Sequence, residues 1–415
     1  MRRPTKLLAI SFPYAPANTP RAVQVARLLK HIDFSTSLIC AEYDPKDDRV
    51  DRNSVSRSEE FLKKCWRVPF SQPSWKKFAR RAAEPFNLAF WDKMPDRYRD
   101  WNKPVLRVIH NAVMQEDKPD LLVTFGSPMS DHLIGLKLKE KYQLPWIAHF
   151  SDPWVDNPFK NFNWLTAKIN RNLERAVFQM ADRLVFTSDE TVSLVMRKYG
   201  KSYLSKARVL PHAFEPDLFT NRVDTAEPLT IRYVGDLYGP RTPEPLFRVL
   251  RRVCIDEPSL LKNINFEFVG GTYDLQLSKM GLEDLPEKLI LFRPTVSYEE
   301  SLALMKSASG LLVIDAPASE SVFLPSKLVD YIGASRPIFG ITPSGTAKIV
   351  IDKLGGWVAN PANINELQVT LKSFLTYVGN NREREWGKSE VRAGYEASRV
   401  GKEFEGIVED LLALN

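Results

Sequence analysis

Short apolar runs alternate with amphipathic stretches along almost the whole chain, and this alternation restricts the fold more than any other feature. The runs are rich in leucine and β-branched residues and are apolar at successive positions, as strands buried on both faces of a sheet are. Helical patterns separate them, which is typical of parallel α/β sheets. We expect strands at residues 6–11, 36–41, 120–125, 146–150, 183–188, 207–211, 229–235, 265–270, 288–292, 310–315, 336–341 and 356–360.

The chain is too long for one hydrophobic core. A length of 415 residues predicts two domains, and residues 212–230 are a linker because they combine turn formers and acids without a core pattern. The prediction is an α/β fold of two doubly wound, Rossmann-like domains, 1–215 and 216–385, that face each other across a cleft. Residues 386–415 are helical, and either cap the second domain or cross back to the first.

Composition restricts the location and the partners. No apolar run approaches the ~20 residues that span a bilayer, and the apolar stretch Leu7 to Phe12 is too short for a signal peptide. The three cysteines have neither metal-binding nor redox spacing, so we expect a reduced, cytoplasmic protein. A net charge of +7 favours an anionic partner, which could be nucleic acid, anionic lipid or a phosphorylated small molecule.

The segment 66–115 interrupts the alternation. It mixes aromatic with basic side chains on expected short helices: Trp75, Phe78, Phe86, Phe90, Trp91 and Trp101 with Lys76, Lys77, Arg80, Arg81, Arg97 and Arg99. Such a mixture suits the interface of an anionic membrane, and the range 75–101 is our candidate for docking there. An ordinary helical insertion with aromatic residues in the core explains it equally well.

In each domain, the loop after the first expected strand contains candidate site residues. The loop SFPYAPANTP, which contains Asn18, precedes a helix expected to begin near Thr19–Pro20; it has no GxGxxG or P-loop pattern. The loop after 229–235 contains Gly235 and then Arg241, at the start of a helix expected near Thr242–Pro243. An arginine beside a helix N-terminus suits a phosphate group, although it could also be a plain surface residue.

The stretch FLPSKLVDYIGASRPIFGI at residues 323–341 carries a second candidate phosphate site. Pro325 and Ser326 begin an expected helix that ends at Gly333, with Lys327 in its first turn. Asp330 lies on the same helical face, three residues on. A cation for a diphosphate and an acid for ribose hydroxyls would together suit a nucleoside diphosphate, whereas a plain i,i+3 ion pair is the alternative.

The chain resembles the GT-B glycosyltransferases of the retaining family 4 type over nearly its whole length. The stretch YVGDLYGPRT resembles the family's G-x-l-x-x-x-K-G loop, with Arg241 at the diphosphate-binding lysine, and PSKLVDYIGASRPIFGI resembles its P-x-K-x-x-E-Y segment. The resemblance implies that Asp330 is the ribose-binding acid. The loop from Phe292 to Thr295, which contains Arg293, corresponds to the base-binding region.

Two positions depart from the family's pattern. The first glutamate of its paired-glutamate motif falls at Val322, which cannot bind a sugar hydroxyl, and the nearby Glu320 is the candidate substitute. At position 330, aspartate in place of glutamate shortens the reach to ribose by one methylene.

The first half of the chain resembles the family around its cleft. WIAHFSDPW resembles the motif that places an acid, here Asp152, facing the donor sugar. FGSPMSDHLIG resembles the preceding loop and helix, which puts Ser127 and His132 on the acceptor side together with Asn18 of the first loop. His132 could equally be a structural histidine of its helix.

The resemblance implies an enzyme that moves a hexose from a nucleoside-diphosphate sugar to a lipid-linked or polysaccharide-precursor acceptor with retention. The catalytic candidates are Asp152, Arg241 and Lys327. No D-x-D motif occurs, so we expect no metal or other cofactor, and Arg241 and Lys327 to stabilise the leaving diphosphate. We expect no nucleic acid partner, and a cytoplasmic location that includes the inner face of the cell membrane. A non-catalytic sugar-nucleotide-binding or scaffold protein and a nonhydrolysing sugar-nucleotide epimerase remain the alternatives.

Overall fold

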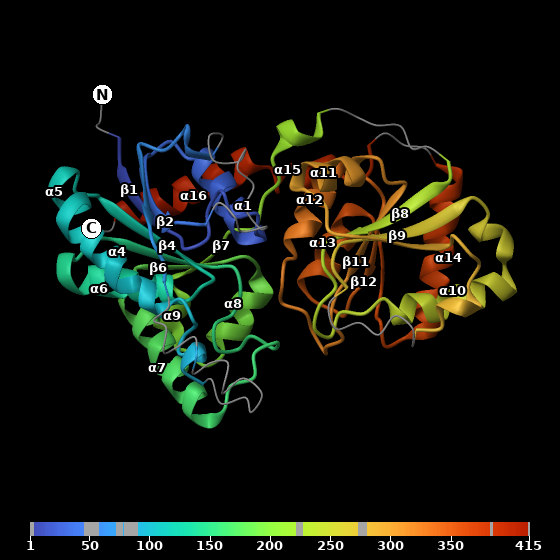
Figure 1. Ribbon diagram of the computed structural model, residues 1–415, viewed down its shortest axis with the longest axis horizontal. Helices are drawn as coiled ribbons and strands as arrows, with labels where there is room; N and C mark the ends of the chain where they lie inside the picture. The colour runs from blue at the N-terminus through green and yellow to red at the C-terminus, as the bar shows by residue number, and fades with distance from the viewer. Residues whose placement is uncertain are drawn as a thin grey trace. The chain divides into compact units, whose positions relative to one another are not determined.

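The computed structural model describes residues 4–44, 58–71, 78, 90–220, 227–272, 280–381 and 385–413. The chain divides into two compact units. Unit 1 comprises Met1–Pro211 and Val400–Asn415, and unit 2 comprises His212–Arg399. Each unit contains one parallel sheet with helices packed against it (Figure 1).

The sheet of unit 1 has seven strands in the order β3-β2-β1-β4-β5-β6-β7. Every pair of neighbours is parallel, and the order reverses direction between β1 and β4. The strands are β1 (Lys6–Ile10), β2 (Ser35–Ala41), β3 (Lys64–Val68), β4 (Leu121–Gly126), β5 (Trp146–Phe150), β6 (Arg183–Phe186) and β7 (Ala207–Val209).

Helices cover both faces of this sheet. Because the chain moves in opposite directions along the sheet after β1 and after β4, right-handed crossovers put α1 and α6 on opposite faces. The helices of the unit are α1 (Pro20–Lys30), α4 (Asn102–Val108), α5 (Met114–Glu116), α6 (Ser130–Tyr142), α7 (Trp164–Met180), α8 (Asp189–Met196), α9 (Lys201–Leu204) and α16 (Ala397–Leu412). A π-helical stretch, Ile109–Val113, joins α4 to α5.

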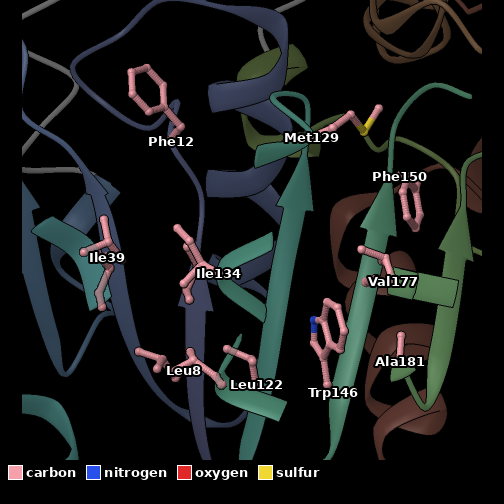
Figure 2. Packing of buried hydrophobic residues seen from close by; sticks show 14 of the residues in the cluster. Leu8, Phe12, Ile39, Leu122, Met129, Ile134, Trp146, Phe150, Val177 and Ala181 are labelled. Carbon is pink, nitrogen blue, oxygen red and sulfur yellow. The ribbon is translucent and has the colours of Figure 1, made fainter. Parts of the chain in front are cut away.

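The core of unit 1 lies between the sheet and the helices α4, α6 and α7. Figure 2 shows side chains from β1, β2, β4 and β5 together with Ile134 of α6 and Val177 of α7. A Cβ on Gly135 of α6 would lie 2.5 Å from the Trp146 ring, so this helix packs closely on β5. Trp101, which precedes α4, is fully buried, and its indole N–H donates to the Val68 carbonyl at 3.0 Å.

The sheet of unit 2 has six parallel strands in the order β10-β9-β8-β11-β12-β13. The strands are β8 (Leu229–Val234), β9 (Ile264–Val269), β10 (Ile290–Arg293), β11 (Gly310–Ile314), β12 (Ile338–Ile341) and β13 (Trp357–Ala359). One buried cluster contains residues of α10 (Glu244–Asp256) and α14 (Ile364–Asn380), and a second contains residues of α11 (Tyr298–Lys306), α12 (Ser326–Ala334) and α13 (Thr346–Leu354). The short α15 (Ser389–Ala393) follows.

The predicted α/β fold of two parallel sheets is confirmed, and every predicted apolar run overlaps a strand. β3 was not predicted. It lies at one edge of the sheet, and of its residues only Val68 is buried. An edge strand of this kind needs no continuous apolar run, so its sequence, KCWRV, carries no such signal.

Two local predictions differ from the structure. α10 begins at Glu244, later than expected, so Arg241 precedes the helix rather than starting it. Gly333 does not end α12, which continues to Ala334 and is closed by Ser335 at a left-handed φ of 55°. Gly333 instead makes room for packing, because a Cβ there would lie 2.6 Å from the Phe219 ring and 2.7 Å from the Phe214 ring.

The start of the predicted linker is packed. Phe214 is 3% exposed, and its backbone pairs with that of Glu396. In the segment 66–115, Phe78 is exposed whereas Trp101 is buried. Arg97 and Arg99 are also exposed, whereas the other side chains that suggested membrane docking, those of Trp75, Lys76, Lys77, Arg80, Arg81, Phe86, Phe90 and Trp91, lie outside the described part of the structure.

The last helix, α16, packs in unit 1. A Cβ at Gly401 would lie 2.1 Å from the carbonyl oxygen of His31, at the end of α1, so the two backbones are in close contact. The Glu405 carboxylate accepts a hydrogen bond from the N–H of Asp33 at 2.5 Å. Among the described residues, no helix is both long enough and apolar enough to cross a membrane.

Candidate functional site

In unit 2, charged side chains gather where β8 and β11 end. Gly235 follows β8 with a φ of +126°, a conformation that favours glycine, and Asp236 follows it. Asp315 directly follows β11 and is 2% exposed. The carboxyl ends of parallel strands form the edge at which open α/β sheets bind ligands.

Arg241 reaches this edge from the loop after β8. Its Nε lies 3.6 Å from a carboxylate oxygen of Asp315, and its guanidinium lies 4.7 Å from the centre of the Tyr238 ring. Burial lowers the pKa of Arg241, but the neighbouring Tyr238 and Asp315 outweigh this effect and raise it. The guanidinium is therefore a permanent positive charge at the end of the sheet.

Lys327 comes from the second position of α12 and faces the same edge. Its Nζ lies 3.7 Å from the centre of the Tyr233 ring. A Cβ on Gly235 would come within 2.9 Å of that Nζ, so the glycine allows the ammonium group to approach the end of β8. Burial and the nearby Arg241 lower the pKa of Lys327 to about 7, although Asp236 and Asp315 oppose the shift.

The acids of this edge are held by hydrogen bonds. Asp315 accepts from the hydroxyl of Ser321 and from the N–H of Ala316 at 2.9 Å. Asp236 accepts from the N–H of Gly271 at 2.7 Å. Sequence reasoning missed Asp315, although an acid immediately after a fully buried strand is a usable signal.

The remaining candidates of unit 2 lie in different surroundings. Ser326 is the first residue of α12 and is half-buried, whereas Asp330 is buried. Glu320 is exposed in the loop after β11, and Val322 beside it is buried. Arg293, at the end of β10, forms a surface ion pair of 2.7 Å with Glu300.

In unit 1, a second group of charges lies where β5 ends. Arg21, at the second position of α1, donates through Nη2 to the carbonyl oxygen of His149 at 3.1 Å, and the same Nη2 lies 3.1 Å from Nδ1 of that histidine. Burial lowers the pKa of Arg21 to about 10, and the neighbouring Asp152 and Asp131 oppose the shift. Asp152 follows β5 and accepts a hydrogen bond from Ser151 Oγ at 3.1 Å.

Asp131 and His132 lie in the first turn of α6 and are both fully buried. One carboxylate oxygen of Asp131 accepts from the N–H of Phe12 at 2.7 Å, and His132 Nδ1 lies 2.8 Å from Thr124 Oγ1. In the part of the chain that the structure describes, the other oxygen of Asp131, Nε2 of His132 and Nε of Arg21 have no hydrogen-bond partner. Three such atoms in one region are unusual, because buried polar groups are nearly always paired.

Burial sets the ionisation of this pair. It raises the pKa of Asp131 well above its ordinary value, against the effect of the Phe12 N–H, and lowers the pKa of His132 well below its ordinary value. The imidazole is therefore neutral at neutral pH. Sequence reasoning singled out His132 but missed Asp131 and Arg21. Their proximity can be recognised only once the fold places α1, α6 and β5 side by side.

The other two candidates of unit 1 lie in loops. Ser127 is half-buried between β4 and α6, and Asn18 is exposed in the loop before α1. Across the described ranges, no group of three or more His, Cys, Asp and Glu side chains is arranged to hold a metal ion.

Comparison with known proteins agrees with this architecture. Residues 21–218 match the model of the family Glycosyltransferase Family 4. The sequence matches no curated protein.

Solved structures match both units. Sucrose-phosphate synthase from Thermosynechococcus elongatus is 14% identical, with a TM-score of 0.67 over 99% of this chain and 100% of that one. HepE of Anabaena, solved with UDP and glucose, is 11% identical, with a TM-score of 0.66 over 98% of this chain and 100% of that one. The lipopolysaccharide outer core galactosyltransferase WaaB is 14% identical, with a TM-score of 0.60 over 98% of this chain and 99% of that one.

The two sheets, with a charged edge at the end of each, therefore define a GT-B fold. On that fold, residues 21–218 match the model of Glycosyltransferase Family 4.

Proposed function

We propose that the chain transfers a hexose from a nucleoside-diphosphate sugar, with retention, and that unit 2 binds the donor. The observation that carries this proposal is the pair of cations at the end of the second sheet. Arg241 and Lys327 approach that edge from two different elements, and they are close enough for Arg241 to lower the pKa of Lys327. Two cations at one sheet edge suit the two phosphates of a diphosphate.

Charge at this position also serves chemistry. When the bond between the sugar and the diphosphate breaks, negative charge develops on the leaving group. A guanidinium and an ammonium fixed beside it stabilise that charge without needing to reorganise. Both cations therefore have roles in binding and in catalysis, and we propose that turnover needs no metal ion. Two HepE structures, one with UDP and glucose and one with UDP-glucose, support a nucleotide-sugar donor of this type.

We propose that the buried polar group of unit 1 faces the sugars. Asp152, Arg21 and the unpartnered Nε2 of His132 offer charged and neutral hydrogen-bonding groups at the end of the first sheet. The acceptor class we propose is a lipid-linked or polysaccharide precursor at the cytoplasmic face of the membrane. The galactosyltransferase WaaB, which acts on the lipopolysaccharide outer core, supports that class.

The test is a binding and turnover series with sugar nucleotides. Isothermal titration with nucleoside, nucleoside diphosphate and intact nucleotide sugar separates base recognition from diphosphate recognition. We expect Arg241→Ala and Lys327→Ala to weaken diphosphate binding while nucleoside binding stays unchanged. Equal losses for all ligands would overturn the assignment of the cations to the diphosphate.

The same series distinguishes the two alternative functions. Donor binding without turnover on any acceptor would favour a non-catalytic protein, for which the apolar Val322 is the relevant feature. Conversion of the donor to an isomer of equal mass, with no acceptor present, would identify an epimerase.

A further inference from the structure

The outward face of α7 has a composition that the donor and acceptor sites do not explain. At its start the helix presents Trp164, which is 76% exposed, and Leu165, which is 40% exposed. Phe159, in the preceding loop, is 41% exposed. Trp164 and Leu165 are neighbours in the chain, and adjoining exposed apolar side chains are the kind of feature that marks an interaction site.

Basic side chains continue the same face along the helix. Lys168, Arg171 and Arg175 follow Trp164 at intervals of four, three and four residues, so all lie on one helical stripe. All three are exposed, and none forms an ion pair with another described residue. We call Phe159, Trp164, Leu165, Lys168, Arg171 and Arg175 the α7 surface.

No acid neutralises this stripe from within α7. The one acidic residue of the helix, Glu174, is fully buried. Its carboxylate accepts hydrogen bonds from the N–H of Val155 at 3.0 Å and from the Tyr199 hydroxyl at 2.7 Å, and it pairs with Lys198 at 2.7 Å. The outer face is therefore positive along its length and apolar at one end.

The helix is held firmly by its inner face. Asn163 caps its first turn by accepting from the N–H of Thr166 at 2.9 Å. Asn170 donates to the Lys93 carbonyl at 2.6 Å and accepts from the Trp154 indole at 2.8 Å. The α7 surface is thus presented at a fixed orientation on unit 1, where α7 lies at one end of the unit (Figure 1).

This combination fits an anionic lipid bilayer better than a protein. A tryptophan ring places its apolar body among the lipid chains and its N–H among the headgroups, while lysine and arginine pair with anionic headgroups. An apolar patch of three side chains is small for a stable protein interface, but it suffices for a helix that lies in the membrane surface.

We propose that the α7 surface docks unit 1 on an anionic lipid bilayer. The loop that contains Asp152 connects β5 to α7, so the docking helix and this candidate site residue belong to the same unit. The proposal does not depend on the donor chemistry of unit 2, and it is tested without any nucleotide.

The experiment is co-sedimentation of the full chain with vesicles at low salt. The vesicles are phosphatidylcholine alone or phosphatidylcholine with phosphatidylglycerol. Each basic residue near an anionic surface contributes about fivefold in affinity, so the triple variant Lys168→Gln, Arg171→Gln, Arg175→Gln should bind the anionic vesicles about a hundredfold more weakly. Thermal unfolding midpoints equal to that of the wild type show that the variant is folded.

The matched control removes the same charge from unit 2. Lys262, Lys353 and Lys388 are exposed, and changing all three to Gln also lowers the net charge by three. We expect this variant to bind nearly as the wild type does. Equal losses in both variants would show that net charge alone drives binding and would overturn the proposal.

A second measurement tests whether the Trp164 ring enters the bilayer. Brominated phosphatidylcholine in the anionic vesicles quenches tryptophans that enter the bilayer, and we expect Trp164→Phe to lose most of the quenching while it still sediments. The proposal fails if the wild type ignores anionic vesicles, if the α7 triple variant sediments as the wild type does, or if the protein binds random oligonucleotides instead of vesicles.

Discussion

Donor affinity should depend on pH through a single ammonium group, that of Lys327. In the ligand-free protein its pKa is about 7, because burial and Arg241 both disfavour the charged form. A diphosphate binds the protonated lysine. The affinity should therefore be full below pH 7 and should fall as pH rises through it.

The size of the effect follows from the protonated fraction. A group of pKa about 7 is about nine-tenths protonated at pH 6 and about one-tenth protonated at pH 8, so the apparent affinity falls about tenfold between them. This corresponds to about 1.4 kcal/mol. An intact nucleotide sugar is the correct ligand, because each of its phosphates has one ester bond and one anhydride bond, and neither titrates in this range.

Isothermal titration at pH 6, 7 and 8 measures the effect directly. At pH 7 the wild type should take up about half a proton per donor bound, which appears as a dependence of the heat on the buffer. Lys327→Arg should bind with no pH dependence, because a guanidinium stays charged throughout. Lys327→Ala should also lose the pH dependence, and at pH 6 should bind about tenfold to a hundredfold more weakly.

A matched variant controls for other titrating groups. Lys353 is exposed on α13, so Lys353→Arg should keep the wild-type pH profile. A tenfold fall in affinity that persists in Lys327→Ala would refute the reasoning, and so would a wild type whose affinity is flat from pH 6 to pH 8.

Three further predictions follow from other features. Arg241→Ala should weaken nucleoside diphosphate binding about tenfold to a hundredfold and should lower kcat. This prediction is wrong if the binding of free nucleoside falls by the same factor. Turnover should survive excess EDTA, since the proposed counter-charges are side chains, and a complete loss that magnesium or manganese restores would contradict this. Gly401→Ala should lower the free energy of unfolding by about 1–3 kcal/mol, because its methyl group would meet the His31 carbonyl. Gly406→Ala on the same helix is the control, since a Cβ there has no neighbour within 4 Å, and denaturant unfolding of both variants decides the matter.

Much of the fold could be predicted because the strands of a buried parallel sheet have a recognisable sequence pattern. A strand covered by helices on both faces must be apolar at successive positions, and β4, β5 and β11, fully buried throughout, are such strands. β3 was not predicted, because an edge strand needs little apolar sequence. In α12, glycine near the end of a helical pattern predicts a helix terminus, but Gly333 instead makes room for two phenylalanine rings.

The candidate site was less predictable, for a different reason. Arg241 and Lys327 can each be identified from the local sequence, because one is a cation near a strand end and the other a cation near a helix start. Arg21 and Asp315 gain their meaning from contacts with distant segments, such as the hydrogen bond from Arg21 to His149, which is 128 residues away. No local pattern encodes such a pairing.

The position of α16 has a consequence for how the protein is made. Unit 1 begins with the first residues of the chain and is completed by Val400–Asn415, after all of unit 2 has been synthesised. Unit 2 can bury its core on the ribosome as soon as its own residues emerge. Until α16 arrives, however, the backbone at the end of α1 lacks the helix that packs against it. Nascent chains stalled before residue 400 should therefore protect unit 2 from protease while leaving the α1 side of unit 1 open to cleavage.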